Sequence, residues 1–147
     1  GGLAVEQLHA FEALVANREQ LVSSFAHAGP ATLCHGDPRA DNLVFDDDGV
    51  PVLFDWQQIA VQFGPADLAW LAATSIEPRN RAAIDHQLAT TYGTTIDQYR
   101  LGFVLPGLAV LLLAQRKIDD ERSARFVATS LIRIATALVD LDVPSWR

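Results

Sequence analysis

The chain has 147 residues, of which 50% are apolar and 20% are charged. A length of about 100–200 residues is typical of one domain, so we expect residues 1–147 to form a single domain. The composition excludes a disordered chain or a fibrous repeat. A single cysteine, Cys34, excludes a disulfide framework and suits a reducing, cytoplasmic compartment. The formal net charge of −7 argues against a protein that binds nucleic acid or an anionic membrane.

The negative charge is unevenly distributed along the chain. Between Asp37 and Asp67 there are seven aspartates and one arginine, whereas the remaining residues carry nearly equal numbers of acids and bases. Nearly all of the excess charge therefore lies in this one stretch.

The N-terminal part predicts one amphipathic helix followed by short strands. Apolar residues recur at helical spacing from Leu3 to about His27, and Gly29-Pro30 ends this pattern. Because Asp46-Asp47-Asp48-Gly49 is a strong turn signal, we expect the apolar segments on either side of it to pair as a β-hairpin. Three apolar segments are typical of strands, at residues 32–34, 43–45 and 52–54.

The rest of the chain predicts helices. Asp67 is expected to cap one of them and to brace the polar loop at residues 35–42. Further helices should follow at residues 78–92 and 119–141. Between these two, Thr95 and Gln98 have the spacing of a capping box, and Pro106 should kink the helix that they open. The uncharged, strongly apolar segment at residues 101–114 is fourteen residues long. A membrane span needs ~20 residues, so we expect a buried helix instead. The predicted fold class is α+β, mainly α.

The segment with the most chemical information is Cys-His-Gly-Asp-Pro-Arg-Ala-Asp-Asn at residues 34–42, followed at a distance by Asp55. We expect Asp37, Asn42 and Asp55 to lie near the same end of the small sheet. Carboxylate and amide oxygens are hard ligands that suit Mg²⁺. A further carboxylate beside a magnesium-bound phosphate can accept the proton of a hydroxyl group.

Residues 35–42, with Phe-Asp-Trp-Gln at 54–57 and the segment 64–69, resemble the aminoglycoside phosphotransferase family of small-molecule kinases, which share the protein-kinase-like fold. The resemblance is specific over about residues 32–75 and looser over 97–102. It implies that Asp37 orients and deprotonates the acceptor hydroxyl and that Asn42 and Asp55 bind magnesium. Asp55 would correspond to the aspartate of the kinase Asp-Phe-Gly motif, which bridges the β- and γ-phosphates through the metal.

Two further features bear on this resemblance. Arg39 stands where many protein kinases place a lysine, so its guanidinium is expected to stabilise charge on the transferred phosphoryl group. Trp56-Gln57 replaces the Phe-Gly of protein kinases, so their activation-loop switching is not carried over to this chain.

The same residues also have a structural interpretation. Asp37 and Asn42 are residue types that hydrogen-bond local backbone in turns, and His35 is expected to brace the loop. Cys34 is expected to be buried and inert. Trp56 and Trp70 are expected in the core.

By this resemblance the chain is the C-terminal lobe of a protein-kinase-like fold, with helices around a small β-hairpin and a catalytic loop. A kinase of this fold also needs an N-terminal lobe with a phosphate-covering loop and a lysine, both before the catalytic segment. The only lysine here is Lys117. We therefore expect a truncated chain that lacks the N-terminal lobe, is inactive alone, and self-associates through the apolar surface left exposed.

The expected function is that of an ATP-dependent phosphotransferase that phosphorylates a hydroxyl of a small molecule, with Mg²⁺ as cofactor. An aminoglycoside-like or choline-like acceptor would suit the acidic segment. One alternative is a non-catalytic binding or regulatory module that retains the kinase-like lobe, and a weaker one is a helical interaction domain. The joint presence of Asp37, Asn42 and Asp55 weighs against the binding module, because such a module has no chemical need for all three.

Overall fold

The computed structural model describes residues 2–143, and its elements are mainly helical. The predicted α+β, mainly α class is therefore confirmed. The helices are α1 (Val5–Ala16), α2 (Arg18–His27), α3 (Pro65–Ser75), α4 (Pro78–Tyr92), α5 (Ile96–Gly102), α6 (Val104–Ala114) and α7 (Glu121–Asp140). The strands are β1 (Ala31–Cys34), β2 (Leu43–Phe45), β3 (Pro51–Leu53) and β4 (Ala60–Phe63), with short 3₁₀ turns η1 (Ala40–Asn42) and η2 (Trp56–Gln58).

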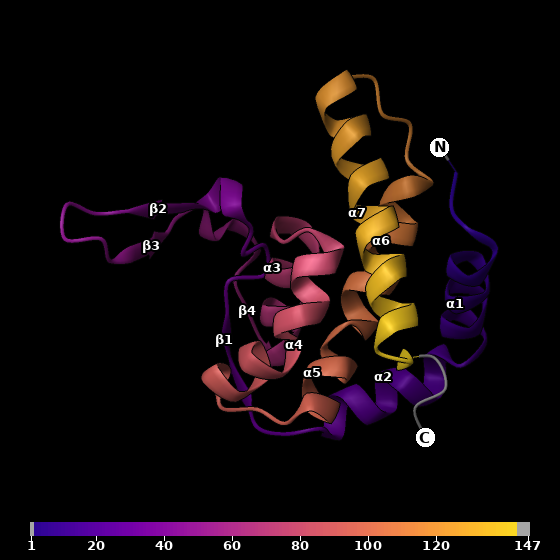
Figure 1. The fold of residues 1–147 in the computed structure, drawn as a ribbon, viewed down its shortest axis with the longest axis horizontal. Helices are drawn as coiled ribbons and strands as arrows, with labels where there is room; N and C mark the ends of the chain where they lie inside the picture. The colour runs from indigo at the N-terminus through magenta and orange to yellow at the C-terminus, as the bar shows by residue number, and fades with distance from the viewer. Residues whose placement is uncertain (1, 144–147) are drawn as a thin grey trace.

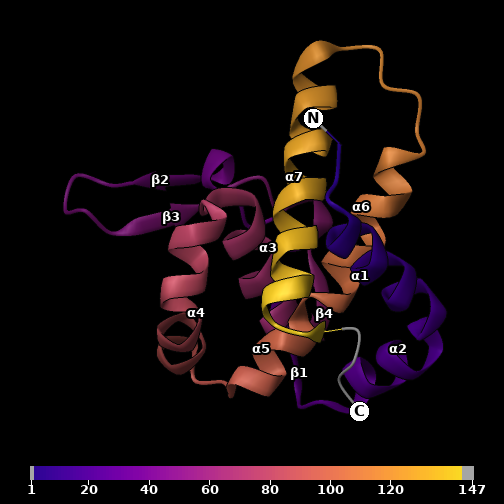
Figure 2. The same ribbon diagram turned by 45° about the vertical axis from the view of Figure 1, so that its right-hand side comes forward.

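Helix α7 is the central element of the fold. It packs against α6 and α1 on one side and against α3 and α4 on the other (Figures 1 and 2). Its fully buried residues Ile134 and Leu138 join Leu14 of α1 and Val110 of α6 in one apolar core. At roughly 25 cal/mol per Å² of buried apolar surface, this core is the main source of stability.

The expected N-terminal helix is two helices, so the prediction of a single helix is wrong. Both the backbone and the side-chain amides of Asn17 donate to the Ala13 carbonyl, at 3.0 Å each, which ends α1. The Asn17 carbonyl then accepts from the Leu21 amide and opens α2. The chain changes direction at this residue (Figure 1), so that α2 reaches α5 while α1 stays on α7.

The expected kink at Pro106 lies earlier in the chain, as a break at Phe103 between α5 and α6. Proline has no amide hydrogen to donate to residue 102, and its ring crowds that carbonyl, so the ladder is interrupted one turn before the ring. The capping box of Thr95 and Gln98 is confirmed: the Thr95 hydroxyl accepts from the Gln98 amide at 3.1 Å.

One stretch of the described residues, Ile96–Ala114, is long and apolar enough by composition to cross a membrane, and 44% of it is buried within the protein. It comprises both α5 and α6. Val104 and Val110 are fully buried in the core, whereas Leu112 is largely exposed.

The strands form two separate two-stranded antiparallel sheets within the described residues. The hairpin prediction is confirmed, because β2 pairs with β3 around the acidic turn. The first predicted strand does not join this hairpin: β1 pairs with β4, a strand that the sequence analysis missed. The hairpin projects away from the helices, while β1 and β4 lie against them (Figure 1).

A buried polar network ties three helices together. Arg81 of α4 is 1% exposed and pairs with Asp85 on the same helix and with Asp140 at the end of α7. The Tyr99 hydroxyl of α5 donates to Asp85 at 2.8 Å. Burial, reinforced by the neighbouring Asp85 carboxylate, raises the pKa of Tyr99, so this hydroxyl remains a donor over the physiological range.

We predict that Arg81→Met lowers the free energy of unfolding by about 3–5 kcal/mol, because it leaves the Asp85 carboxylate buried without its cation. Urea unfolding followed by circular dichroism measures this loss. Arg79→Met is the matched control, since Arg79 is exposed on the same helix, and it should change the value by less than about 0.5 kcal/mol. Equal effects of the two substitutions would contradict a structural role for the network.

Candidate active site

The loop between β1 and β2 is held by one carboxylate of α3. Asp67 accepts from the backbone amides of His35, at 2.6 Å, and Gly36, at 3.1 Å. The sequence analysis assigned Asp67 to the cap of its own helix, which is wrong, because the N-cap residue is Gly64 and no side chain caps it. Asp67 lies in the first turn instead and braces the loop.

His35 is a structural residue, as expected. Its Nδ1 accepts from the Asp37 amide at 3.3 Å, which requires the ring hydrogen to be on Nε2. Nε2 accordingly donates to the Phe54 carbonyl at 2.7 Å. The ring is buried and lies 4.6 Å from that of Trp56, centroid to centroid. The two ring nitrogens thus connect the loop to the end of the hairpin.

Gly36 allows the loop to turn tightly. Its φ of +85° lies in the left-handed region that favours glycine, and a Cβ there would come within 2.2 Å of the Gln58 carbonyl oxygen. A larger residue would push the loop away from η2.

The Asp37 carboxylate has three side-chain neighbours. Trp70 of α3 donates its indole N–H to Oδ1 at 2.7 Å, and the Asn42 amide donates to Oδ2 at 3.2 Å. Arg39 Nε lies 3.2 Å from Oδ2, although its N–H is not aimed for a hydrogen bond. The carboxylate is therefore fixed in direction and placed beside a cation. Trp70 is half-buried and packs against the core, as expected, whereas Trp56 is 44% exposed, so the expectation of a core position is wrong for Trp56.

The Arg39 guanidinium is held between charged and aromatic groups. It lies 4.7 Å above the Phe126 ring of α7 and 3.7 Å from the Asp41 carboxylate. This arrangement keeps the Arg39 guanidinium close to the Asp37 carboxylate and to the cavity above Asp37.

Asn42 is 4% exposed, and its side-chain amide also donates to the Asp37 carbonyl at 2.9 Å. Because the nitrogen makes these contacts, the amide oxygen is the atom that remains to face a cation. The Asn42 backbone carbonyl accepts from the Phe54 amide at 3.1 Å, which extends the hairpin by one residue pair. Asn42 therefore links the loop to the hairpin, as His35 does.

Asp55 follows the hairpin directly, and its side chain is exposed. Among the described residues it makes no direct hydrogen bond to Asp37 or Asn42, although its neighbour Phe54 bonds to both Asn42 and His35. Its φ of 64° and ψ of 59° are left-handed, a conformation that costs a non-glycine residue roughly 1–2 kcal/mol. The structure thus joins Asp37, Arg39 and Asn42, and places Asp55 beside this group without contact.

The candidate oxygen ligands suit Mg²⁺, which takes few ligands from the protein, better than a metal ion whose ligands all come from the protein. In residues 2–143 no group of three or more His, Cys, Asp and Glu side chains is arranged to hold a metal ion. The Asn42 amide oxygen and the Asp55 carboxylate are hard donors from adjacent backbone positions. Mg²⁺ typically takes one or two protein oxygens and completes its shell with water and phosphate. This pair matches that pattern.

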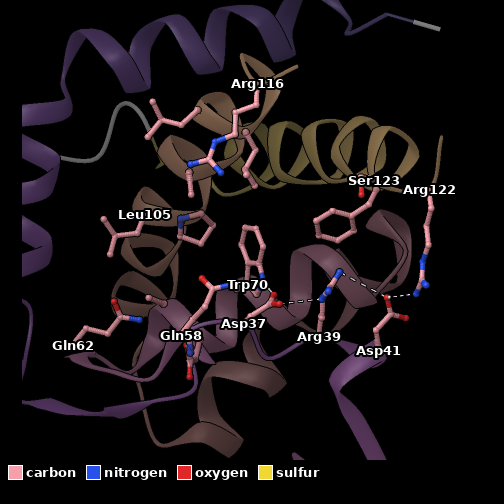
Figure 3. A pocket seen from close by; sticks show the side chains of 18 residues that line it. Asp37, Arg39, Asp41, Gln58, Gln62, Trp70, Leu105, Arg116, Arg122 and Ser123 are labelled. Carbon is pink, nitrogen blue, oxygen red and sulfur yellow. Dashed lines mark hydrogen bonds and ion pairs between the residues drawn. The ribbon is translucent and has the colours of Figure 1, made fainter. Parts of the chain in front are cut away.

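A cavity of about 960 Å³ opens above Asp37 (Figure 3). Its floor contains Asp37, Asp67 and Trp70, and Arg39 and Asp41 lie at one side together with Phe126, Arg122 and Ser123 of α7. The opposite wall is apolar and comes from α6. Its residues are Leu105, Pro106, Ala109, Leu112 and Leu113, and Arg116 lies just beyond the end of the helix. Asn42 and Asp55 are not part of the cavity lining.

The hydrogen bond from Trp70 to Asp37 and the apolar cavity wall were not predicted from the sequence. Trp70 lies three residues after Asp67, a spacing that places both on one helix face. That periodicity was present in the sequence, but nothing local indicated that the indole would meet Asp37. The contact between Phe126 and Arg39 likewise joins residues far apart in the chain.

Comparison with known proteins identifies the class. The model of the phosphotransferase enzyme family matches residues 2–101, which is most of the chain, so the protein belongs to this family. The match confirms the resemblance to aminoglycoside phosphotransferases and includes Asp37, Arg39, Asn42 and Asp55. Searches of curated proteins and of solved structures gave no match. Helices α6 and α7, which line the cavity, lie outside the matched range.

Cys34 is 2% exposed, and its thiol lies 3.7 Å from the Gln62 carbonyl of β4. Burial, together with the nearby negative charge of Asp67, raises the pKa of the Cys34 thiol above its ordinary value of 9.0. The prediction of a buried cysteine is confirmed.

We predict that native Cys34 reacts with an aromatic disulfide reagent at pH 8 at least a hundredfold more slowly than in urea. Access is blocked and the thiolate, the reactive form, is disfavoured. Because folding raises the pKa of this thiol, its contribution to the free energy of unfolding is complete only at a pH below the pKa of the thiol in the unfolded chain. Folding stability should therefore fall as the pH rises above about 9, and less so in Cys34→Ala. Rapid labelling of the folded protein at pH 8 would contradict this assignment.

Proposed function

We propose that this chain is the catalytic lobe of an ATP-dependent phosphotransferase with a protein-kinase-like fold, acting on the hydroxyl of a small molecule. The observation that carries the proposal is the Asp37 carboxylate, oriented by Trp70 and Asn42 at the floor of a large cavity. Membership of the phosphotransferase enzyme family supports the reaction class. Acceptors such as aminoglycoside-like or choline-like alcohols follow from the resemblance.

In this proposal Asp37 acts as the base. The acceptor oxygen forms a bond to the γ-phosphorus of ATP, the bond to the β-phosphate oxygen breaks, and the hydroxyl proton passes to Asp37. Arg39 stabilises the negative charge on the transferred group. The hydrogen bonds from Trp70 and Asn42 keep the carboxylate in position as the proton moves.

Magnesium would be held by the Asn42 amide oxygen and the Asp55 carboxylate, where it would neutralise charge on the donor phosphates. The left-handed conformation of Asp55 supports a functional role, because such backbone strain is concentrated at functional sites. The conformation turns the chain out of β3 and leaves the carboxylate exposed.

We further propose that an N-terminal lobe supplies the grip on ATP, because a lysine suited to the donor phosphates does not occur before Asp37 in this sequence. The projecting hairpin supports this. Its side chains Val44, Phe45, Val52 and Phe54 are between 43% and 65% exposed, which is unusual for large apolar residues on adjacent strands. Without a partner lobe the same surface would favour self-association. A free buried thiol and an ATP donor both suit a cytoplasmic location.

We predict that Asp37→Asn reduces kcat by about 10²–10⁴-fold, because the amide cannot accept the hydroxyl proton. The measurement is ADP release, in the presence of an alcohol acceptor, by the protein from the complete reading frame. Asp47→Asn in the exposed hairpin turn is the matched control and should retain activity. Nucleotide affinity should be unchanged in both variants. Full turnover in Asp37→Asn would mean that another group is the base.

We predict that Asp55→Asn raises the magnesium concentration needed for half-maximal activity by at least tenfold, because a neutral amide is a weaker ligand than a carboxylate. Titration of activity with MgCl₂ at fixed ATP measures this shift. Asp48→Asn, which removes one charge from the nearby hairpin turn, controls for the change in net charge. Superimposable titrations of Asp55→Asn and the unchanged protein would remove Asp55 from the metal site.

The second candidate is a non-catalytic binding module that retains the same lobe. The exposure of Asp55 favours it, because among the described residues no hydrogen bond fixes the Asp55 carboxylate relative to Asp37 and Asn42. Such a module would bind a small molecule in the cavity, with affinity indifferent to Mg²⁺ and to Asp55→Asn.

A further inference from the structure

We propose that the cavity selects an acceptor with an apolar body and an anionic group, rather than the cationic acceptor that the acidic sequence segment suggests. This inference rests on the proposed function, which places the acceptor hydroxyl at Asp37. It assigns the recognition of the anionic group to Arg116.

The first step concerns the three carboxylates of the lining, each of which already has partners within the protein. Asp67 accepts two backbone N–H groups of the loop. Asp37 accepts from Trp70 and Asn42 and lies beside Arg39. Asp41 faces two guanidinium groups, at 3.7 and 4.0 Å. The negative charges of the cavity are therefore largely compensated before any ligand enters.

The second step concerns Arg116, whose charge is not compensated. It follows α6 directly, and within residues 2–143 its guanidinium has neither an ion pair nor a side-chain hydrogen bond. Figure 3 shows it on the side of the cavity away from Asp41, with the guanidinium turned toward the cavity. Arg122 is 91% exposed and lies 4.0 Å from Asp41, the pair already counted for that carboxylate. Arg116 is thus the one cation of the cavity lining without a charged partner among the described residues.

The third step concerns the wall between Arg116 and Asp37. It consists of apolar side chains of α6, including Leu105, Pro106 and Leu113, and the Trp70 indole lies beside it (Figure 3). Such a wall offers no partners for the many hydroxyl and ammonium groups of a polycationic sugar, and burying those groups unpaired is costly. A volume of about 960 Å³ accommodates a drug-sized molecule. A ring or chain lying on this wall would connect a hydroxyl at Asp37 to an anion at Arg116.

The test compares alcohols that share a ring system and differ in one substituent, which is anionic, neutral or cationic. The probes are 4-(hydroxymethyl)benzoate, its carboxamide and the corresponding benzylammonium, and the biphenyl homologues of all three, because the two ring systems differ in span. Binding to the chain is followed through the Trp70 indole N–H resonance. We expect at least one carboxylate to bind about fivefold more tightly than its amide and its ammonium analogue. Higher salt should reduce this preference.

The variants Arg116→Gln and Lys117→Gln form a matched pair. They are adjacent and remove the same charge, but Lys117 pairs with Asp119 and does not line the cavity. The carboxylate preference should disappear in Arg116→Gln and persist in Lys117→Gln. The inference would be overturned by equal loss of the preference in both variants or by a preference that survives Arg116→Gln. It would also be overturned by tighter binding of the ammonium probes, or by no binding of any probe at millimolar concentration.

Phosphorylation of the same probes separates this inference from the proposed function. Carboxylate-selective binding that depends on Arg116, without transfer from ATP by the protein of the complete reading frame, would uphold the anion site and refute the phosphotransferase. Transfer that favours the ammonium probes would uphold the phosphotransferase and refute the anion site.

Discussion

The position of one face of α3 determines the geometry of the whole site. Asp67, Trp70 and Ser75 lie along this helix and contact three successive parts of the β1–β2 loop. Asp67 accepts the amides at the start of the loop, Trp70 donates to the Asp37 carboxylate, and the Ser75 hydroxyl accepts from the Ala40 amide at 2.8 Å. Because α3 is itself buried against α5 and α7, these contacts connect the loop to the protein core and add to the bonds that His35 and Asn42 make within it. Accurate positioning of reacting groups requires this kind of support.

Features set by neighbours in the chain were predictable from the sequence. The Asp-Asp-Asp-Gly turn predicts the hairpin, and Thr95 with Gln98 predicts a capping box, because each signal acts over a few residues. The chemical segment at residues 34–42 was also recognisable, and the structure brings Asp37, Arg39 and Asn42 together. The pairing of β1 with β4 was not predicted, since it depends on how η2 returns the chain to β1. The same limit applies to Phe126, which reaches Arg39 from a distant helix.

The charge of the site likewise depends on tertiary contacts that the local sequence does not reveal. The sequence places an excess of aspartates between Asp37 and Asp67, and this suggests a cavity that attracts cations. In the folded chain these carboxylates either face solvent, in the hairpin turn and at Asp55, or are held by backbone amides, an indole and guanidinium groups. The electrostatic character of a cavity therefore depends on which charges remain without partners, and the count of acids in a segment does not reveal it.

The two backbone bonds of Phe54 have a mechanical consequence. Its amide is bonded to Asn42 and its carbonyl to the His35 ring, and both of these residues hold Asp37. The projecting hairpin is thus connected through Phe54 to the loop that carries Asp37. A displacement of the hairpin, for example on contact with another chain, would therefore be transmitted to the Asp37 carboxylate.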